Sequence, residues 1–231
     1  MSQRMLVIAA HPDDEVLGCG GTIAKYAQKG EEIYVEILGE GITSRYEECK
    51  KGELKRELQN LRKNALEASK VLGVKRVSFH KFPDNRFDSV DRLKIIKVIE
   101  ESIKKIKPDI VFTHHRGDLN IDHRRTFDAV MVATRPTGKN SVSVKKILSF
   151  EVPSSTEWQV PASEYYFMPN VFVDVDGTLE KKLEAMKAYQ SEIREYPHPR
   201  SLEGIKILAK MRGLAVGKNV CEAFELSREI L

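Results

Sequence analysis

The fold is decided by one stretch of sequence, MLVIAAHPDDEVLGCGGTIAKY at residues 5–26. It begins with an uninterrupted apolar run, Met5–Ala10, that turns polar abruptly at its end, which is typical of a strand buried on both faces. The glycine-rich segment GCGG at 18–21 predicts a turn, and Thr22–Gln28 has the spacing of a helix. A buried strand followed closely by a helix is the first half of a βαβ unit, so we expect a parallel sheet.

The rest of the chain continues this alternation. Further strands are predicted at Glu32–Leu38, Arg76–Phe79, Asp109–Thr113, Lys146–Val152 and Val171–Val175. Helices are predicted at Glu47–Leu72, Val90–Ile106, Thr126–Ala133, Leu179–Glu192 and Leu202–Met211. The pattern predicts a single α/β domain over residues 1–231 with a mostly parallel sheet. Residues 136–170 are rich in loops, and we expect them to form a cap over the site.

Composition excludes several classes of protein. Lys and Arg number 38 against 34 Asp and Glu, and the net charge of +4 is too small to indicate a nucleic-acid partner. The three cysteines have no CxxC spacing, which favours a reducing compartment over a disulfide framework. No apolar segment has the length of a signal peptide core or a membrane span. We therefore expect a soluble, cytoplasmic protein.

Two polar motifs follow predicted strands and carry the residues for chemistry. HPDDE at 11–15 places three carboxylates within one turn, where they repel one another unless a cation binds. THHRGDLNIDHRR at 113–125 follows a second strand and supplies His123, with Asp122 beside it. Taken alone, each motif is also compatible with helix capping. Because the carboxyl ends of parallel strands meet at one edge of the sheet, the two motifs together favour a metal site, and His with carboxylate suits zinc.

At this point the sequence resembles a known family. The segments that carry the resemblance are AHPDDEVLGCGGTIAKY at 10–26, LGV at 72–74, FPDNRFD at 82–88, DLNIDH at 118–123 and the stretch from Arg212 to Glu225. Over nearly the whole chain they are similar to the zinc-dependent N-deacetylases called LmbE-like or PIG-L. The resemblance implies a Rossmann-like α/β fold, a zinc ion and removal of acetyl from N-acetylglucosamine-type amino sugars. It also implies a homo-oligomer, a trimer or a hexamer.

Residue roles follow from the same resemblance. His11, Asp14 and His123 would be the zinc ligands, one ion per chain, and Asp13 would be the general base. A His₂-carboxylate set leaves a position for water, whose pKa zinc lowers to about 7. Asp122, next to His123, suits a carboxylate that orients a ligand. Such sites also accept Fe(II), Co(II) or Mn(II).

One position departs from the family. Many members carry a histidine three residues before the third ligand, where this chain has Asn120 in DLNIDH. An amide donates a hydrogen bond but carries no titratable proton at neutral pH. Asn120 would therefore polarise the substrate carbonyl, and the general acid is open among Asp13, His114, His115 and His198.

Substrate contacts are predicted for Arg62 and Asp84, which match family positions near the pocket. The competing interpretations are an ion pair on the helix for Arg62 and an ordinary turn residue for Asp84. Trp158 and Glu151 are further candidates for a sugar platform. GCGG lacks the G-x-G-x-x-G spacing, so a nicotinamide cofactor is not expected.

The sequence thus predicts a metal-dependent hydrolase that removes the N-acetyl group of an amino sugar or its conjugate. The alternative from another class is a sugar or nucleotide-sugar binding module whose chemistry has lapsed, which Asn120 alone favours. A two-metal phosphoesterase is the second alternative, although it needs more ligands than this cluster offers.

Overall fold

A computed structural model describes residues 2–45, 51–136 and 144–231. Its centre is a seven-stranded sheet of order β3-β2-β1-β4-β5-β7-β6. Strands β1 to β5 pair in parallel, and β7 runs antiparallel to both β5 and β6. The strands are β1 Arg4–Ala9, β2 Glu32–Gly39, β3 Arg76–Phe82, β4 Ile110–His114, β5 Lys146–Phe150, β6 Val171–Asp174 and β7 Cys221–Glu229.

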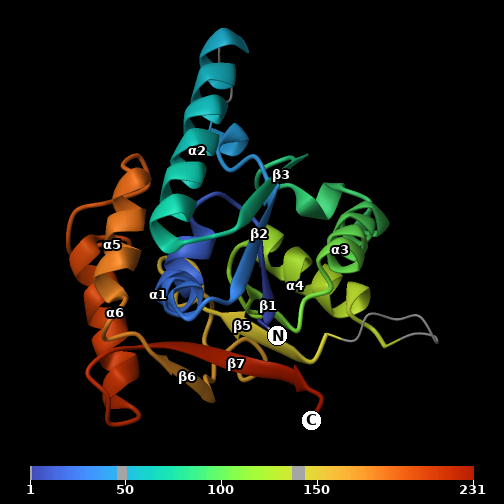
Figure 1. Cartoon of the computed structure of the whole chain (residues 1–231). Coiled ribbons are helices and arrows are strands. Elements are labelled where there is room, and N and C mark those ends of the chain that lie inside the picture. The colour runs from blue at the N-terminus through green and yellow to red at the C-terminus, as the bar shows by residue number, and fades with distance from the viewer. Residues whose placement is uncertain (1, 46–50, 137–143) are drawn as a thin grey trace.

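Helices cover both faces of this sheet. They are α1 Asp14–Gln28, α2 Lys51–Leu72, α3 Arg92–Ile106, α4 Ile121–Ala133, α5 Leu179–Ala188 and α6 Leu202–Leu214, with short 3₁₀ turns at Thr43–Arg45 and Phe87–Ser89. Figure 1 shows α1, α2, α5 and α6 on one side of the sheet and α3 and α4 on the other. This is the mostly parallel, Rossmann-like α/β arrangement that the sequence predicts.

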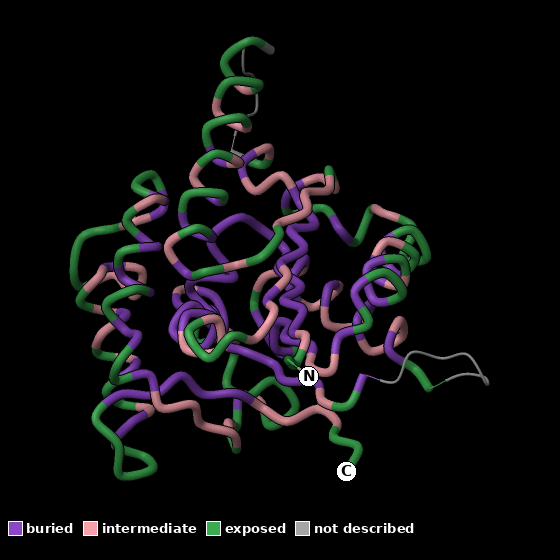
Figure 2. The backbone as a smooth tube through the Cα atoms, in the orientation of Figure 1, coloured by how far each residue is buried: buried purple, intermediate pink, exposed green. Residues whose placement is uncertain are grey.

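The alternation along β1 explains its unbroken apolar sequence. Met5, Val7 and Ala9 belong to the core beneath α1, α2, α5 and α6, whereas Leu6 and Ile8 belong to the core beneath α3 and α4. A strand buried on both faces has no polar side, so every position is apolar. The purple central strands of Figure 2 contrast with the exposed first turns of α2.

Two helix starts and one strand differ most from the prediction. Helix α1 begins at Asp14 rather than Thr22, because GCGG forms a kink at Cys19 inside the helix instead of a turn before it. Helix α4 begins at Ile121 rather than Thr126, since Asn120 caps it. Strand β7 is missing from the prediction altogether. Residues 47–50 of the predicted Glu47–Leu72 helix lie outside the described residues.

The segment expected to form a cap is partly described. Residues 137–143 lie outside the described part of the chain, and residues 151–170 contain neither helix nor strand. Among the described residues, no helix combines the length and the apolar character that crossing a membrane requires.

Candidate active site

The candidate site lies where β1 and β4 end side by side. The strand order reverses here, because β2 lies on one side of β1 and β4 on the other, and open parallel sheets form their clefts at such points. A cavity of about 150 Å³ opens at this place. Its lining consists of His11, Pro12, Asp13, Asp14, Gly41, Ser44, Asp84, Asn85, Asn120, His123, Glu192 and Arg200.

Three buried donors converge in this cavity. Asp14 Oδ2 lies 3.5 Å from His11 Nδ1 and 3.4 Å from His123 Nε2. One ligand atom from each of these three residues fits within 4.8 Å of the others. Two imidazole nitrogens and a carboxylate are a donor set that suits zinc and leaves room for water. The residues therefore fit a divalent metal of this class.

The two histidines are oriented by different carboxylates. His11 Nε2 donates to Asp122 Oδ2 at 2.9 Å, and Asp122 accepts backbone N–H groups from Asn85 (2.6 Å) and Phe87 (2.8 Å). Asp122 thus orients the ring of His11 across the cavity, a histidine of the other motif, and not that of its sequence neighbour His123. Because Nε2 of His11 is engaged, Nδ1 is the nitrogen that faces Asp14.

Asp118 takes the corresponding place beside His123. Its Oδ1 lies 3.1 Å from His123 Nδ1, and the carboxylate also accepts the hydroxyls of Ser155 and Thr156. The backbone N–H of Asn120 donates to the same Oδ1 at 2.8 Å. A carboxylate held by several donors fixes the ring orientation of a metal-binding histidine. Asp118 has this role in the structure without having been singled out from the sequence.

The charges of the cluster are strongly coupled. Burial alone would lower the pKa of His11, but its contacts with Asp122 and Asp14 raise that pKa to about 10. Burial also disfavours the charged form of His123, yet the carboxylates of Asp14 and Asp118 raise its pKa to about 9. For Asp14, burial opposes ionisation, while the imidazoles of His123 and His114 lower its pKa well below the usual value. Without metal, the protons on the two histidines supply the positive charge that these carboxylates require.

Asp13 is held in an unusual conformation. Its φ of 110° lies in the left-handed region, which costs a non-glycine residue about 1–3 kcal/mol. Its backbone N–H donates to Glu15 Oε2 at 3.1 Å, and Tyr189 donates its hydroxyl to Glu15 Oε1 at 2.6 Å. Burial raises the pKa of Asp13 well above its usual value, with Arg200 opposing the shift from 3.3 Å away. A buried carboxyl beside the metal-binding set, with a raised pKa, has the properties of a general base.

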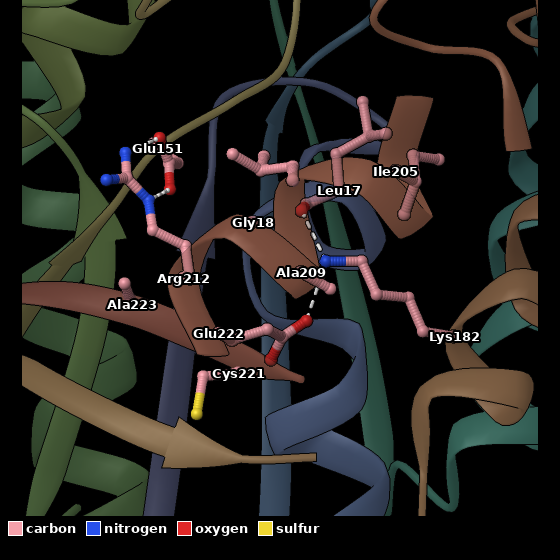
Figure 3. Close-up of a pocket in the computed structure, with 11 residues that line it drawn as sticks. Leu17, Gly18, Glu151, Lys182, Ile205, Ala209, Arg212, Cys221, Glu222 and Ala223 are labelled. Carbon is pink, nitrogen blue, oxygen red and sulfur yellow. Dashed lines mark hydrogen bonds and ion pairs between the residues drawn. The ribbon is translucent and has the colours of Figure 1, made fainter. Parts of the chain in front are cut away.

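A buried ion pair supports the turn that presents Asp13 and Asp14. At the Cys19 kink, Glu222 accepts the backbone N–H groups of Gly21 (2.9 Å) and Thr22 (2.6 Å). Lys182 donates to Glu222 Oε1 at 2.6 Å and to the carbonyl of Leu17 at 2.8 Å (Figure 3). The interrupted helix thereby keeps partners for the backbone groups on both sides of its kink.

Glycine is required on the sheet side of the same kink. A Cβ atom on Gly18 would lie 2.3 Å from Cδ2 of Phe150, well inside van der Waals contact. The kink therefore brings α1 close to β5. This close packing explains the glycine-rich sequence after HPDDE without a phosphate-binding role.

The other predicted residues fall into two groups. Asn120 and Asp84 line the cavity, where Asn120 Oδ1 accepts the N–H of Asp122 as a helix cap. Asp84 Oδ2 accepts the Ser44 hydroxyl at 2.5 Å, and its Oδ1 lies 3.2 Å from His11 Nε2. Arg62 is not part of this lining.

Arg62 instead lies over the ring of Phe79 at 5.7 Å and lines a separate hollow along α2. In the part of the chain that the structure describes, Arg62 is outside the cavity lining; its substrate contact and the alternative ion pair both stay predictions. Trp158 is half-exposed outside the cavity and makes an edge contact with His198 at 5.6 Å. Glu151 accepts two hydrogen bonds from Arg212 (Figure 3).

None of the three histidines considered as general acid lines the cavity. His114 accepts the N–H of Ala10 at 2.9 Å, and burial, together with His123, lowers the pKa of His114 to about 3. His115 lies 3.0 Å from Glu225 and is buried. Nδ1 of His198 accepts the backbone N–H of Arg200.

Arg200 and Glu192 are cavity residues that sequence reasoning missed. Arg200 Nη1 lies 3.3 Å from Asp13 Oδ2 and 3.5 Å from Glu192 Oε2, and its Nε donates to the Ser154 hydroxyl at 2.7 Å. Both residues come from the irregular segment between α5 and α6. The sequence predicts that the helix from Leu179 continues to Glu192, but α5 ends at Ala188, and no motif in the residues that follow placed them beside HPDDE.

Known proteins match this chain over most of its length. A curated relative from Escherichia coli K12, the uncharacterized deacetylase YaiS, is 33% identical over 199 residues, which are 81% of this chain and 90% of YaiS. Diacetylchitobiose deacetylase from Thermococcus kodakarensis is 28% identical over 84% of this chain and 71% of its own. The crystal structure of 4-carboxy-2-hydroxymuconate hydratase from Pseudomonas putida KT2440 superposes with a TM-score of 0.77 at 20% identity, over 99% of this chain and 98% of the hydratase.

The family itself is shown by sequence. The model of the PIG-L family, described as GlcNAc-PI de-N-acetylase, matches residues 6–134, a range that contains His11, Asp13, Asp14 and His123. With the match to YaiS, this makes the chain a member of the PIG-L (LmbE-like) family.

Proposed function

We propose that this protein is a metal-dependent N-deacetylase that hydrolyses the acetamide of an N-acetylglucosamine-type sugar or conjugate. The observation that carries the proposal is the position of Asp13, a buried carboxyl beside the convergent donors His11, Asp14 and His123. Membership in a family with deacetylase relatives supports the amide as the bond that is cleaved. Zinc is the metal we expect from the donor set.

The residues divide the reaction among them. His11, Asp14 and His123 would hold the ion, which when bound acidifies water and polarises the acetamide carbonyl. Asp13 accepts the proton of the attacking water and then returns it to the amine that leaves, because no histidine lines the described cavity besides the two ligands. The amide of Asn120 lies in the same lining and can donate to the carbonyl oxygen. Arg200 holds the carboxylate of Asp13 in place.

Asp84 is the residue of the cavity that we expect to contact substrate hydroxyls. Both oxygens of Asp84 already face Ser44 and His11, so we expect Asp84 to act on the sugar together with the Ser44 hydroxyl rather than alone. Arg62 lies outside the cavity lining and has no role in this proposal.

The test is acetate release from N-acetylglucosamine and its glycosides, with metal content measured on the same preparation. We expect acetate only with metal bound, and a loss of about 10²–10⁴-fold in kcat for Asp13→Asn with metal retained. His123→Ala should lose the metal; full occupancy in that variant would remove His123 from the ligand set. Metal-dependent binding of sugars without acetate from any of them would favour the lapsed binding module instead.

The fold shared with a hydratase gives a second outcome to measure. A hydratase adds water to a carbon–carbon double bond and releases no acetate. Incubation with 4-carboxy-2-hydroxymuconate, the tricarboxylate in that hydratase's name, followed by its ultraviolet absorbance, therefore separates the two reactions. Loss of that absorbance without acetate release from any sugar would overturn the deacetylase proposal.

A further inference from the structure

A cavity of about 540 Å³ lies between the irregular segment after β5 and the end of α6. This volume is within the range of sites that hold small molecules. The lining combines Glu151 and residues from the range 156–169 with Met211 and Arg212 of α6. Among the described residues, none lines both this cavity and the candidate active site. We call it the α6 cavity, and it is a separate place for a ligand.

Apolar side chains of this lining are left in contact with solvent. Half or more of the surface is exposed at Val160, Tyr166, Met168 and Met211. Single exposed apolar residues are common, but a group of them around one cavity indicates a place where something binds. A ligand with an apolar body would cover these side chains and remove their apolar surface from water, which favours binding.

One wall of the α6 cavity is held in place without any ligand. Phe167 is buried there, and its ring makes an edge contact with that of His115 at 5.2 Å between ring centres. The guanidinium of Arg212 lies over the Phe167 ring at 5.4 Å and donates two hydrogen bonds to Glu151 (Figure 3). A wall that is already ordered loses little entropy when a ligand binds.

Close backbone packing fixes the two tyrosines of the lining. A Cβ atom on Gly117 would lie 2.3 Å from the carbonyl oxygen of Tyr165, so the two backbones touch. The N–H groups of Tyr165 and Tyr166 both donate to the carbonyl of Ala162, at 2.9 and 3.0 Å. The backbone that carries both rings is therefore held against the loop before α4.

The charges of the lining favour a cation. Arg212 and Glu151 balance each other through their two hydrogen bonds, and Glu157 is the remaining charged residue of the lining. The Glu157 carboxylate accepts the backbone N–H groups of Ser154 (2.5 Å) and Ser155 (3.3 Å), and within the described ranges it forms no ion pair. One carboxylate is thus left for a positive group, whereas an anion would find the guanidinium already engaged.

We infer that the α6 cavity is an effector site for an organic cation, in which a protonated amine or a quaternary ammonium group is joined to an apolar body. The ammonium group lies near Glu157 and the rings of Tyr165 and Tyr166, because aromatic faces attract cations. The apolar body covers Met168 and Met211. This inference does not rest on the proposed function, because the site lies outside the candidate active site.

The turn before Glu157 connects the α6 cavity with the metal-donor set. Thr156 lines the cavity, and its hydroxyl donates to Asp118 Oδ2 at 2.7 Å. Asp118 Oδ1 in turn lies 3.1 Å from Nδ1 of His123. A ligand that contacts Glu157 stabilises this turn in the conformation that holds Asp118. Zinc should therefore bind more tightly when the cavity is filled.

Calorimetry with the metal-free full chain tests the site. The probes are benzyltrimethylammonium, tetramethylammonium, which lacks the apolar body, and benzenesulfonate, which reverses the charge. Neither ammonium ion carries a donor for a metal. We expect benzyltrimethylammonium to bind at least about tenfold more tightly than the other two probes. Glu157→Gln and Tyr166→Leu should each weaken its binding about five- to tenfold.

Glu164 supplies a matched control. It is an exposed carboxylate of the same segment that does not line the α6 cavity, so Glu164→Gln should leave the affinity unchanged. No measurable binding of benzyltrimethylammonium, or equal losses in Glu157→Gln and Glu164→Gln, would overturn the site. Displacement of the probe by an excess of methyl N-acetylglucosaminide would place the probe in the candidate active site and would also overturn the inference.

Zinc titrations with and without saturating benzyltrimethylammonium measure the connection to the metal-donor set. We expect the zinc affinity to rise about fivefold with the probe, and the probe to bind the zinc-loaded protein more tightly by the same factor. Thr156→Val removes the hydroxyl that contacts Asp118, so it should abolish this rise while the probe still binds. An unchanged zinc affinity in the unaltered protein would overturn the effector role.

Sedimentation velocity on the same samples tests a second copy of the chain as the occupant. We expect the sedimentation coefficient to be the same for the unaltered protein and for Tyr166→Ser. Dissociation caused by Tyr166→Ser, together with exclusion of the probe from the unaltered protein, would show that another copy covers the cavity and would overturn the inference.

Discussion

The buried pair of Lys182 and Glu222 predicts a large loss of stability when one partner is removed. The two residues are 4% exposed each, and Lys182 also holds the carbonyl of Leu17 at the α1 kink. Lys182→Met nearly keeps the length of the side chain but leaves the Glu222 carboxylate without its cation. Breaking a buried pair in this way costs about 3–5 kcal/mol. For a domain of this size, about 2–4 °C per kcal/mol converts that loss to roughly 6–20 °C in Tm.

Calorimetry and circular dichroism measure the loss, with Lys181→Met as the control. Lys181 is exposed on the same helix, so its replacement should change Tm by no more than 1–2 °C. Because Glu222→Gln removes the charge that Lys182 balances, the double variant Lys182→Met/Glu222→Gln should be less destabilised than the sum of its single variants. A Tm for Lys182→Met equal to that of the control, or strict additivity in the double variant, would refute the role of the pair.

Four further predictions concern the site itself. Because His11 and His123 have pKa values raised to about 10 and 9 without metal, a metal must displace their protons, and its affinity should rise with pH from 6 to 9 in a metal titration. The free energy of unfolding of the metal-free protein should change in the opposite direction. The two protonated histidines stabilise the fold fully below about pH 6.5, and this contribution is lost as the pH rises through 9 and 10. Thermal unfolding in the presence of a chelator measures the loss. Asp118→Asn should weaken zinc binding about 10–100-fold while the fold persists, and unchanged affinity would contradict its role beside His123. Asp13→Gly should raise Tm by relieving the left-handed φ while it abolishes turnover, and a lowered Tm would show that the conformation is not strained.

Most of the fold follows from the sequence because β1 is apolar at every position after Arg4. A strand that is buried on both faces has an unbroken apolar sequence, which fits neither a helix nor a half-exposed strand. The parallel sheet follows from that strand and the helix after it. Strand β7, CEAFELSRE, was not found because only its first four residues are fully buried and its second half is polar. Pairing with β5 and β6, rather than local sequence, makes it a strand.

The convergence of His11, Asp14 and His123 was predictable from the sequence, whereas the partner of Asp122 and the contact between Asp118 and His123 were not. His11, Asp14 and His123 follow two strands whose ends meet at one edge, which sequence spacing can indicate. Asp118 and Asp122 lie on either side of Asn120, the N-cap of α4. The course of that loop decides that Asp118 contacts His123 and Asp122 contacts His11. Local sequence does not encode the course of that loop, so the contact between Asp122 and His11 could not be predicted from adjacency.

The left-handed conformation of Asp13 indicates selection for chemistry over stability. A glycine at this position would avoid both the strain and the burial of a carboxyl beside Asp14 and Glu15. The structure instead holds Asp13 at two points: its backbone N–H donates to Glu15 at the start of α1, and its carboxylate lies 3.3 Å from Arg200 of the segment after α5. Contacts that stabilise an intrinsically unfavourable residue have no purpose in a scaffold alone. They are expected where the carboxyl must face His11, Asp14 and His123 at a fixed position, as the general base that we propose would.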